Sequence, residues 1–346
     1  MTSPLRVVQW ATGNVGLRSL RTVLDHPNLD LVGLYVHSEE KAGVDAGTLC
    51  GLRPVGVAAT RDVGEIVALG ADCVLYMPFA YDGDDMVRLL EAGTNIVTTR
   101  VDFQNPHFVE PGLRARIEDA CRRGGSSVFS TGCSPGIGSD VIPAALLAFQ
   151  RRLDRVTVDE YADSSTRDSP DILFGAMGFG RPPTRETAER LAASLKHSRQ
   201  QSFHLLADAL GIPLDGVETH AEIGVATTRT EIAAGTIEAG TIGAVRLTVS
   251  GVRAGAPLVR FRATWYVTRD LDVDWGELLR SGWRIAVEGD TPMDVLITFP
   301  VPDEEYAAFT PGLTAHPAVN AVPAVCAARP GIVRALELPP LLPAFA

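Results

Sequence analysis

The stretch Ala11-Thr12-Gly13-Asn14-Val15-Gly16 decides the fold of this 346-residue chain. Its glycines have the spacing of the dinucleotide-binding turn, with alanine where the first glycine usually stands. A strand is predicted directly before it, over residues 6–10, and a helix directly after it, to about residue 25. Gly13 would let a pyrophosphate approach the backbone, and Gly16 would let the helix pack closely on the sheet. We therefore predict that residues 12–16 bind a dinucleotide, the alternative being a tight turn with a structural role alone.

Strands and helices alternate in the first part of the chain. After the opening strand, β-rich runs occupy residues 29–36, 72–77, 95–99 and 127–130. Helical patterns lie between them, near residues 63–69, 84–92 and 113–123. Strands separated by helices of this length form βαβ units and a parallel sheet. The expected fold class is α/β, with an N-terminal Rossmann-type domain over residues 1–150.

The second half has a different pattern. A strand at residues 155–161 is followed by a loop rich in Ser, Asp, Gly and Pro, and then by an amphipathic helix near residues 185–210. Long strands with glycine turns fill residues 217–267, and another strand pair surrounds residues 283–287 and 294–299. We expect an α+β domain over residues 151–312 with an open, mostly antiparallel sheet. The C-terminal segment, residues 313–346, begins with a helix and is expected to pack back on the Rossmann domain.

The end of the second strand selects between the two nicotinamide dinucleotides. An acidic residue about 20 positions after the glycines holds the ribose hydroxyls of NAD. Here the chain reads Val36-His37-Ser38-Glu39-Glu40-Lys41, with His37 and Ser38 at the expected contact positions. Lys41 offers a positive charge to a 2′-phosphate, so we favour NADP(H). NAD(H) stays an alternative, because Glu39 or Glu40 would be the selecting acid if the strand ended later.

The bulk composition excludes several classes of partner. With 31 basic and 42 acidic residues, the formal charge of −11 disfavours nucleic acid, whose phosphates require a basic face. The densest apolar run, residues 141–149, is too short to span a membrane, and no signal peptide is expected before the first strand. The five cysteines are scattered without a C-x-x-C pair, and the seven histidines lack metal-ligand spacing. We therefore expect reduced thiols, no metal and a cytoplasmic location.

One motif points to a different class of enzyme. The segment Gly132-Cys133-Ser134-Pro135-Gly136 matches the G-x-S-x-G elbow of serine hydrolases, between a predicted strand and a helix. The oxyanion hole of that elbow uses the backbone N–H of the residue after the serine, and Pro135 has none. We therefore interpret the segment as a loop at the carboxyl edge of the sheet, beside the nicotinamide. In this interpretation Cys133 and Ser134 are cofactor contacts.

Four segments carry a resemblance to a known family. They are residues 7–16 (VVQWATGNVG), 130–136 (STGCSPG), 235–245 (GTIEAGTIGAV) and 318–326 (AVNAVPAVC). With these segments the chain resembles the dihydrodipicolinate reductase-like proteins, and within them the 2,4-diaminopentanoate dehydrogenase and native amine dehydrogenase branch. The resemblance implies a homodimer and a Rossmann domain completed by the C-terminal helix. It also implies NAD(P)H-dependent reduction of a C=N or C=O carbon in a small organic substrate.

Two departures from the family pattern limit what is carried over. Dihydrodipicolinate reductases have a His-His pair and a Lys with a Pro-Ser-Gly-Thr stretch, and residues 156–170 have none of these. The amine dehydrogenases use a glutamate shortly after the strand that corresponds to residues 95–99. Here the chain reads Arg100-Val-Asp102-Phe-Gln-Asn-Pro106, and Asp102, one methylene shorter, is the nearby carboxylate. Asp102 is our candidate for handling the proton of the reaction, the alternative being a loop aspartate that caps a turn.

The substrate is expected between the sheet domain and the carboxyl edge of the Rossmann strands, where α/β folds bind ligands. Hydride would pass between nicotinamide C4 and the substrate carbon while the protein orients the reactants and manages one proton. Three functions stay open: an amine dehydrogenase or imine reductase, a carbonyl reductase, and a non-enzymatic NAD(P)-binding regulator. Tyr161 is a second candidate catalytic residue. Asp163, Arg167 and Asn320 are predicted to line the substrate pocket, and further predicted cofactor contacts are Met77, Pro78, Thr99 and Asn320.

Overall fold

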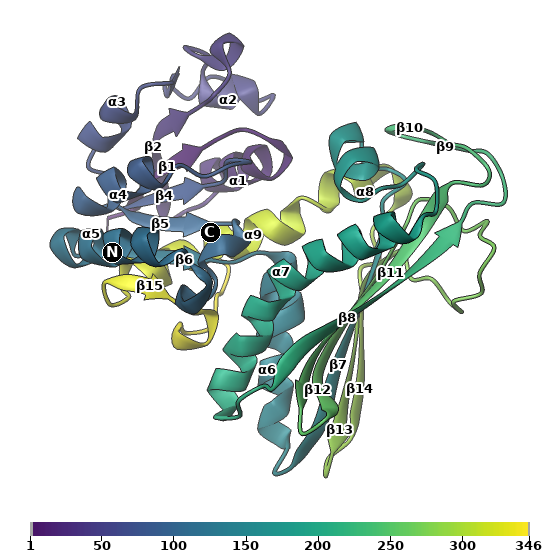
Figure 1. Cartoon of the computed structure of the whole chain (residues 1–346). Helices are drawn as coiled ribbons and strands as arrows, with labels where there is room; N and C mark the ends of the chain where they lie inside the picture. The colour runs from purple at the N-terminus through teal and green to yellow at the C-terminus, as the bar shows by residue number, and fades with distance from the viewer. Residues whose placement is uncertain (1–2, 345–346) are drawn as a thin grey trace. The chain divides into compact units, whose positions relative to one another are not determined.

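A computed structural model describes residues 3–344, and its chain forms two compact units (Figure 1). Unit 1 comprises the described residues up to Ile137 together with those from Ala308 onward, and unit 2 is Gly138–Ala307. The predicted boundaries differ from these: residues 138–150 group with unit 2, and residues 308–312 group with unit 1. Within residues 3–344, no helix has both the length and the apolar composition that crossing a membrane requires.

Unit 1 contains a seven-stranded sheet in which every neighbouring pair is parallel. Its order is β15-β6-β5-β4-β1-β2-β3. The Rossmann-type parallel sheet is therefore confirmed, but the two edge strands, β3 and β15, escaped prediction. The strands are β1 Leu5–Trp10, β2 Leu29–Tyr35, β3 Ala59–Thr60, β4 Cys73–Tyr76, β5 Asn95–Thr98, β6 Ser127–Ser130 and β15 Gly331–Val333.

Helices cover both faces of this sheet, and apolar side chains fill the two layers between. One layer holds buried residues of α1, α2 and α9 against alternate strand positions, and the other holds residues of α3, α4 and α5. Because successive side chains of a strand point to opposite faces, each buried strand supplies both layers. The helices are α1 Asn14–Leu24, α2 Ala46–Leu49, α3 Val63–Ala68, α4 Gly83–Glu91, α5 Pro111–Gly124 and α9 Gly312–Cys326.

The turn at residues 11–16 is a tight connection between β1 and α1. Ala11 has a φ of +72°, in the left-handed region that alanine rarely adopts. The Ala11 carbonyl oxygen lies so close to α1 that a Cβ on Gly16 would come within 2.3 Å of it. The buried Gln9 side chain donates from Nε2 to the same oxygen at 3.0 Å. The close approach of turn and helix therefore requires glycine at position 16, whereas a Cβ on Gly13 would meet no atom within 4 Å.

Unit 2 contains a six-stranded sheet in the order β14-β13-β7-β12-β11-β8. Only the β12–β7 pair of this sheet is parallel, so the mostly antiparallel sheet is confirmed. A separate hairpin joins β9 Thr230–Ile232 and β10 Gly235–Ile237. The six strands are β7 Leu153–Asp163, β8 Gly216–Val225, β11 Ile242–Arg253, β12 Ala256–Tyr266, β13 Ser281–Gly289 and β14 Met293–Thr298.

The long helix α7, Arg185–Leu210, packs along β8 and β11 and covers one face of this sheet. It begins where the Thr184 side chain accepts a hydrogen bond from the Thr187 N–H, and it ends at Gly211 in the left-handed conformation. Two shorter helices lie before β7 and after β14: α6 Ile142–Leu146 and α8 Asp303–Phe309.

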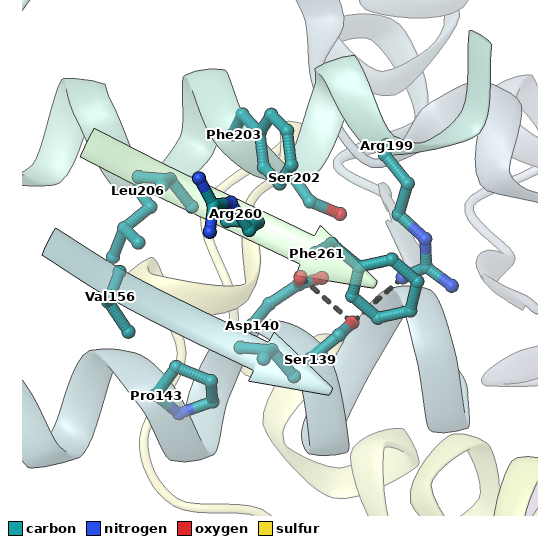
Figure 2. Close-up of a pocket in the computed structure, with 12 residues that line it drawn as sticks. Ser139, Asp140, Pro143, Val156, Arg199, Ser202, Phe203, Leu206, Arg260 and Phe261 are labelled. Atoms are coloured by element: carbon teal, nitrogen blue, oxygen red, sulfur yellow. Dashed lines mark hydrogen bonds between the residues drawn. The ribbon is translucent and has the colours of Figure 1, made fainter. Parts of the chain in front are cut away.

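A buried polar cluster lies under α7 (Figure 2). Arg199 is only 2% exposed, and its guanidinium lies over the Phe261 ring, 3.7 Å from the centroid. Its Nη1 donates to Ser139 Oγ at 3.1 Å, and Ser139 Oγ donates to Asp140 at 3.0 Å. The cavity beside them holds about 10 Å³, space for about one water molecule. These contacts join α7 to the segment before α6 and to β12.

We expect Gly16→Ala to destabilise the protein without cofactor by about 1–3 kcal/mol, because the new Cβ would force α1 away from the Ala11 carbonyl. Gly13→Ala is the matched control, and it should change the free energy of unfolding by less than about 0.5 kcal/mol. Urea unfolding of the apo protein measures both values. Equal destabilisation by the two substitutions would show that the close approach at residue 16 does not set the position of α1.

Candidate functional site

The carboxyl ends of the parallel strands of unit 1 bring most predicted cofactor contacts to one edge of the sheet. Residues 11–16 follow β1, residues 37–41 follow β2, and residues 77–79 follow β4. Thr99 follows β5, and residues 131–136 follow β6. Since ligands of open α/β sheets bind outside the carboxyl ends of the strands, this edge is the candidate cofactor site.

Helix α1 has no side-chain cap at its N-terminus, whereas α3 and α4 each have one. Gly13 is the N-cap residue, and no side chain caps the helix. By contrast, α3 and α4 begin at Asp62 and Asp82, whose carboxylates each accept two backbone N–H groups of the first turn. The missing carboxylate leaves the positive end of the α1 dipole available for an external anion. This arrangement suits the pyrophosphate of a dinucleotide.

Two positively charged side chains, Lys41 and Arg61, lie near the end of β2. The Lys41 Nζ donates to the Thr12 carbonyl oxygen at 3.2 Å and to Thr12 Oγ1 at 3.1 Å, so it lies beside the glycine turn. Arg61 follows β3 and lies 4.0 Å from the carboxylate of Glu39, whose side chain is 91% exposed. His37 is exposed and sets its ring edge against Tyr35, while Ser38 precedes the short 3-10 turn Glu39–Lys41. Arg61 was not among the predicted contacts, because the strand before it, β3, has only two residues.

The Arg100 side chain joins the loop after β5 to the loop after β4. The Arg100 guanidinium contacts Asp102 Oδ2 through Nε at 3.0 Å and through Nη2 at 2.8 Å. Its Nη1 donates to the Phe79 carbonyl oxygen at 2.5 Å, next to Met77 and Pro78, which are both buried. Asp102 therefore has a positioning contact that the sequence did not reveal. We call the set Asp102, Arg100 and Phe79 the Arg100 clip.

The second oxygen of Asp102 is available for other contacts. Among the residues that the structure describes, Asp102 Oδ1 accepts no hydrogen bond, and the side chain is 24% exposed. The predicted proton-handling role of Asp102 therefore stays a prediction, in which Oδ1 would act while Oδ2 contacts Arg100.

Aromatic side chains support the same edge. The Trp10 and Tyr35 rings stack with centroids 3.8 Å apart, and Trp10 also contacts Tyr76. Burial raises the pKa of Tyr76 to about 12, so the phenol keeps its proton at neutral pH. Its hydroxyl oxygen accepts the Asp82 N–H at 2.9 Å, which fixes the start of α4. These contacts join the ends of β1, β2 and β4 at this edge of the sheet.

The loop after β6 does not have the geometry of a hydrolase elbow. Ser134 has extended backbone angles, and Pro135 supplies no backbone N–H. Cys133 and Ser134 are both partly exposed at the carboxyl end of β6, where a cofactor contact remains predicted. The serine hydrolase alternative thus gains no support from the structure.

The predicted substrate residues are divided between the two units. Tyr161 and Asp163 lie near the end of β7 in unit 2, and Arg167 is exposed on the loop that follows. Since Val156 and Val158 line the cavity under α7, strand alternation places Tyr161 on the opposite sheet face. Asn320 belongs to unit 1, where it lines an open groove of about 410 Å³ with side chains from α1. Within residues 3–344, no three His, Cys, Asp or Glu side chains gather as a metal site.

Known proteins resemble this chain over much of its length. Residues 197–344 match the 2,4-diaminopentanoate dehydrogenase C-terminal domain family. An amine dehydrogenase from Streptomyces virginiae is 32% identical over 97% of this chain and 96% of its own length. A 4-hydroxy-tetrahydrodipicolinate reductase from Anaeromyxobacter sp. (strain Fw109-5) is 29% identical over 51% of this chain and 66% of its own. The solved structure of an amine dehydrogenase from Mycobacterium smegmatis shares the fold, with a TM-score of 0.79 and 21% identity over 98% of this chain and 97% of its own.

We expect Arg100→Ala and Asp102→Ala each to raise the dinucleotide Kd about fivefold to twentyfold, because Arg100 holds the Phe79 carbonyl of the loop after β4 and Asp102 orients Arg100. The double variant should lose little more than either single variant, since both belong to one clip. Titration of cofactor fluorescence measures the Kd values, and Arg116→Ala, which breaks an exposed ion pair with Asp84, is the control.

A role of Asp102 in proton handling has a different signature. In that case Asp102→Asn should lower kcat strongly while the cofactor Kd stays near the wild-type value.

For the Arg100 clip itself, an unchanged cofactor Kd in both Arg100→Ala and Asp102→Ala would contradict a role in cofactor binding.

Proposed function

We propose a function from one premise: the chain belongs to the amine dehydrogenase family. It is an oxidoreductase that uses a nicotinamide dinucleotide, and we propose that it interconverts a small carbonyl compound plus ammonia with a primary amine. In the reductive direction the carbonyl carbon adds ammonia and loses water, and the resulting C=N carbon receives hydride. The cofactor supplies the hydride from nicotinamide C4. Two observations together support the proposal. The chain belongs to this family, and the N-terminus of α1, in the turn at residues 11–16, has no side-chain cap.

The protein's own part is to bind, to orient and to move one proton. Backbone N–H groups of residues 13–16 are proposed to hold the pyrophosphate, with Thr12 and Lys41 beside it. Met77, Pro78, Thr99, Cys133 and Ser134 are proposed to contact the nicotinamide half. Asp102 is proposed to handle the proton through Oδ1, because Oδ2 is held by Arg100. Tyr161, Asp163, Arg167 and Asn320 stay predictions for substrate binding.

We propose NADP(H) as the preferred cofactor. Lys41 and Arg61 place two positive charges around the end of β2, where a 2′-phosphate would lie. The candidate acid for NAD, Glu39, is directed to Arg61 and is almost fully exposed. The homodimer and the cytoplasmic location stay predictions from the resemblance and the composition.

Arg61→Ala should raise the Kd of NADPH about tenfold and leave the Kd of NADH within about twofold, since only NADPH carries the 2′-phosphate. Lys41→Ala should weaken both cofactors, and NADPH more, because it also removes the contacts to Thr12. The control is Glu39→Gln, which removes the acid beside Arg61 and should not weaken NADPH. If Arg61→Ala raised the Kd of NADPH and the Kd of NADH equally, Arg61 would not be the residue that selects between the two cofactors.

The central experiment follows NADPH oxidation with a panel of small aldehydes and ketones, with and without ammonium chloride. Oxidation that requires ammonia, together with the matching primary amine by mass spectrometry, is the expected result. Turnover that is equally fast without ammonia would instead identify a carbonyl reductase. Tight cofactor binding without turnover on any carbonyl would favour a non-enzymatic regulator.

A further inference from the structure

Phe79 is the most exposed large apolar residue among those that the structure describes. It follows β4, in unit 1, and is 92% exposed. Single exposed apolar side chains are common on protein surfaces, so exposure alone identifies no site. Phe149 in unit 2, for example, is 66% exposed. Two further observations distinguish Phe79 from such residues: its place at the edge of the sheet and the hydrogen bond to its backbone.

The loop that carries Phe79 lies where the strand order of the parallel sheet reverses. From β1 the chain adds β2 and β3 on one side of the sheet, and then β4, β5 and β6 on the other. The reversal therefore falls between β1 and β4, and ligands of open α/β sheets bind outside the carboxyl ends of the strands at such a point. Phe79 follows the carboxyl end of β4, beside the turn at residues 11–16.

The backbone of Phe79 is held in place although its ring is exposed. Its carbonyl oxygen accepts a hydrogen bond from Arg100 Nη1 at 2.5 Å, and the two preceding residues, Met77 and Pro78, are buried. A ring on a held backbone loses little conformational freedom when a flat ligand covers it. The covered ring also removes apolar surface from water, which favours binding.

The same loop adjoins the end of β2, where the adenosine ribose of a dinucleotide is expected. Because β2 and β4 are both neighbours of β1, their ends lie about 9–10 Å apart. Asp85, near the start of α4, lies within electrostatic range of Tyr35 at the end of β2 and of His37 after it. A base stacked on the Phe79 ring would lie about 3.5–4 Å from it, so a purine fits between the two strand ends.

We propose that the Phe79 ring stacks on the adenine base of the dinucleotide and so positions the cofactor along the edge of the sheet. The inference deepens the proposed function and rests on its dinucleotide site. Stacking needs only the face of the base, which NADPH and NADH share. Phe79 would therefore bind both cofactors equally, whereas Lys41 and Arg61 would respond to the 2′-phosphate.

The test measures the binding of four ligands to the full chain by calorimetry. NADPH and NADH are compared with adenosine 2′,5′-bisphosphate and ADP-ribose, which carry the adenine and lack the nicotinamide. Phe79→Ala should raise the Kd of every ligand that the wild type binds by about tenfold, because each one contains the base. Phe79→Tyr keeps the ring and should bind the same ligands within about threefold of the wild type.

Phe149→Ala is the matched control, since it removes another exposed phenylalanine, from unit 2, and should leave all Kd values unchanged. The urea midpoint of the apo protein should also stay the same in Phe79→Ala, because the exposed ring contributes little to the folded state. A loss of affinity without a change in that midpoint separates a ligand contact from a structural role.

Three results would overturn the inference. They are Kd values within twofold of the wild type in Phe79→Ala, a loss confined to NADPH and NADH, and a loss that Phe79→Tyr does not restore. The second of these would place the ring against the nicotinamide half instead of the adenine. Failure of the proposed function is distinguishable, because binding is measured without turnover. A protein that loses adenine affinity in Phe79→Ala but never turns over with ammonia would contradict the proposed reaction and support the role of Phe79.

Discussion

The approach of α1 to the Ala11 carbonyl is the constraint on which the rest of unit 1 depends. A helix that packs this closely requires a glycine at position 16, and the turn requires a residue that tolerates a positive φ at position 11. Gln9 stabilises the arrangement by binding the same carbonyl from the buried end of β1. Because α1 is held here, its uncapped N-terminus points along the carboxyl edge of the sheet. The candidate cofactor site is thus a consequence of backbone packing more than of any single side chain.

Side chains then hold the loops around that edge in place. Lys41 reaches back to Thr12, the Arg100 clip joins the loops after β4 and β5, and Tyr76 fixes the start of α4. These contacts are present in the structure without a ligand. Contacts of this kind reduce the conformational entropy that the loops lose when a ligand binds. In unit 2, two neutral indoles hold a buried carboxylate: the N–H groups of Trp265 and Trp283 both donate to Glu160.

Local patterns in the sequence predicted the large elements well and the small ones poorly. The helix at residues 185–210 has a capping threonine before it and a glycine after it, so its bounds were predictable. Strands β3 and β15 have two and three residues, too few to show a period, and Arg61 was missed with β3. The Arg100 clip depends on β4 and β5 being neighbours, which chain order alone does not establish. The sequence could not show which face of β7 carries Tyr161, because only the position of α7 decides which face of that strand is covered.

The last strand of unit 1 has a consequence for how the protein is made. β15 pairs with β6 and α9 covers the same sheet as α1, yet both follow the 170 residues of unit 2 in the chain. At a synthesis rate of about 5–20 residues per second, β6 emerges on the order of 10–40 s before β15, the strand that completes its sheet. During that interval the edge of β6 and the apolar surface that α9 later covers are exposed on the nascent chain. Unit 2 is continuous in sequence, so all of its residues emerge before the last strand and helix of unit 1 do.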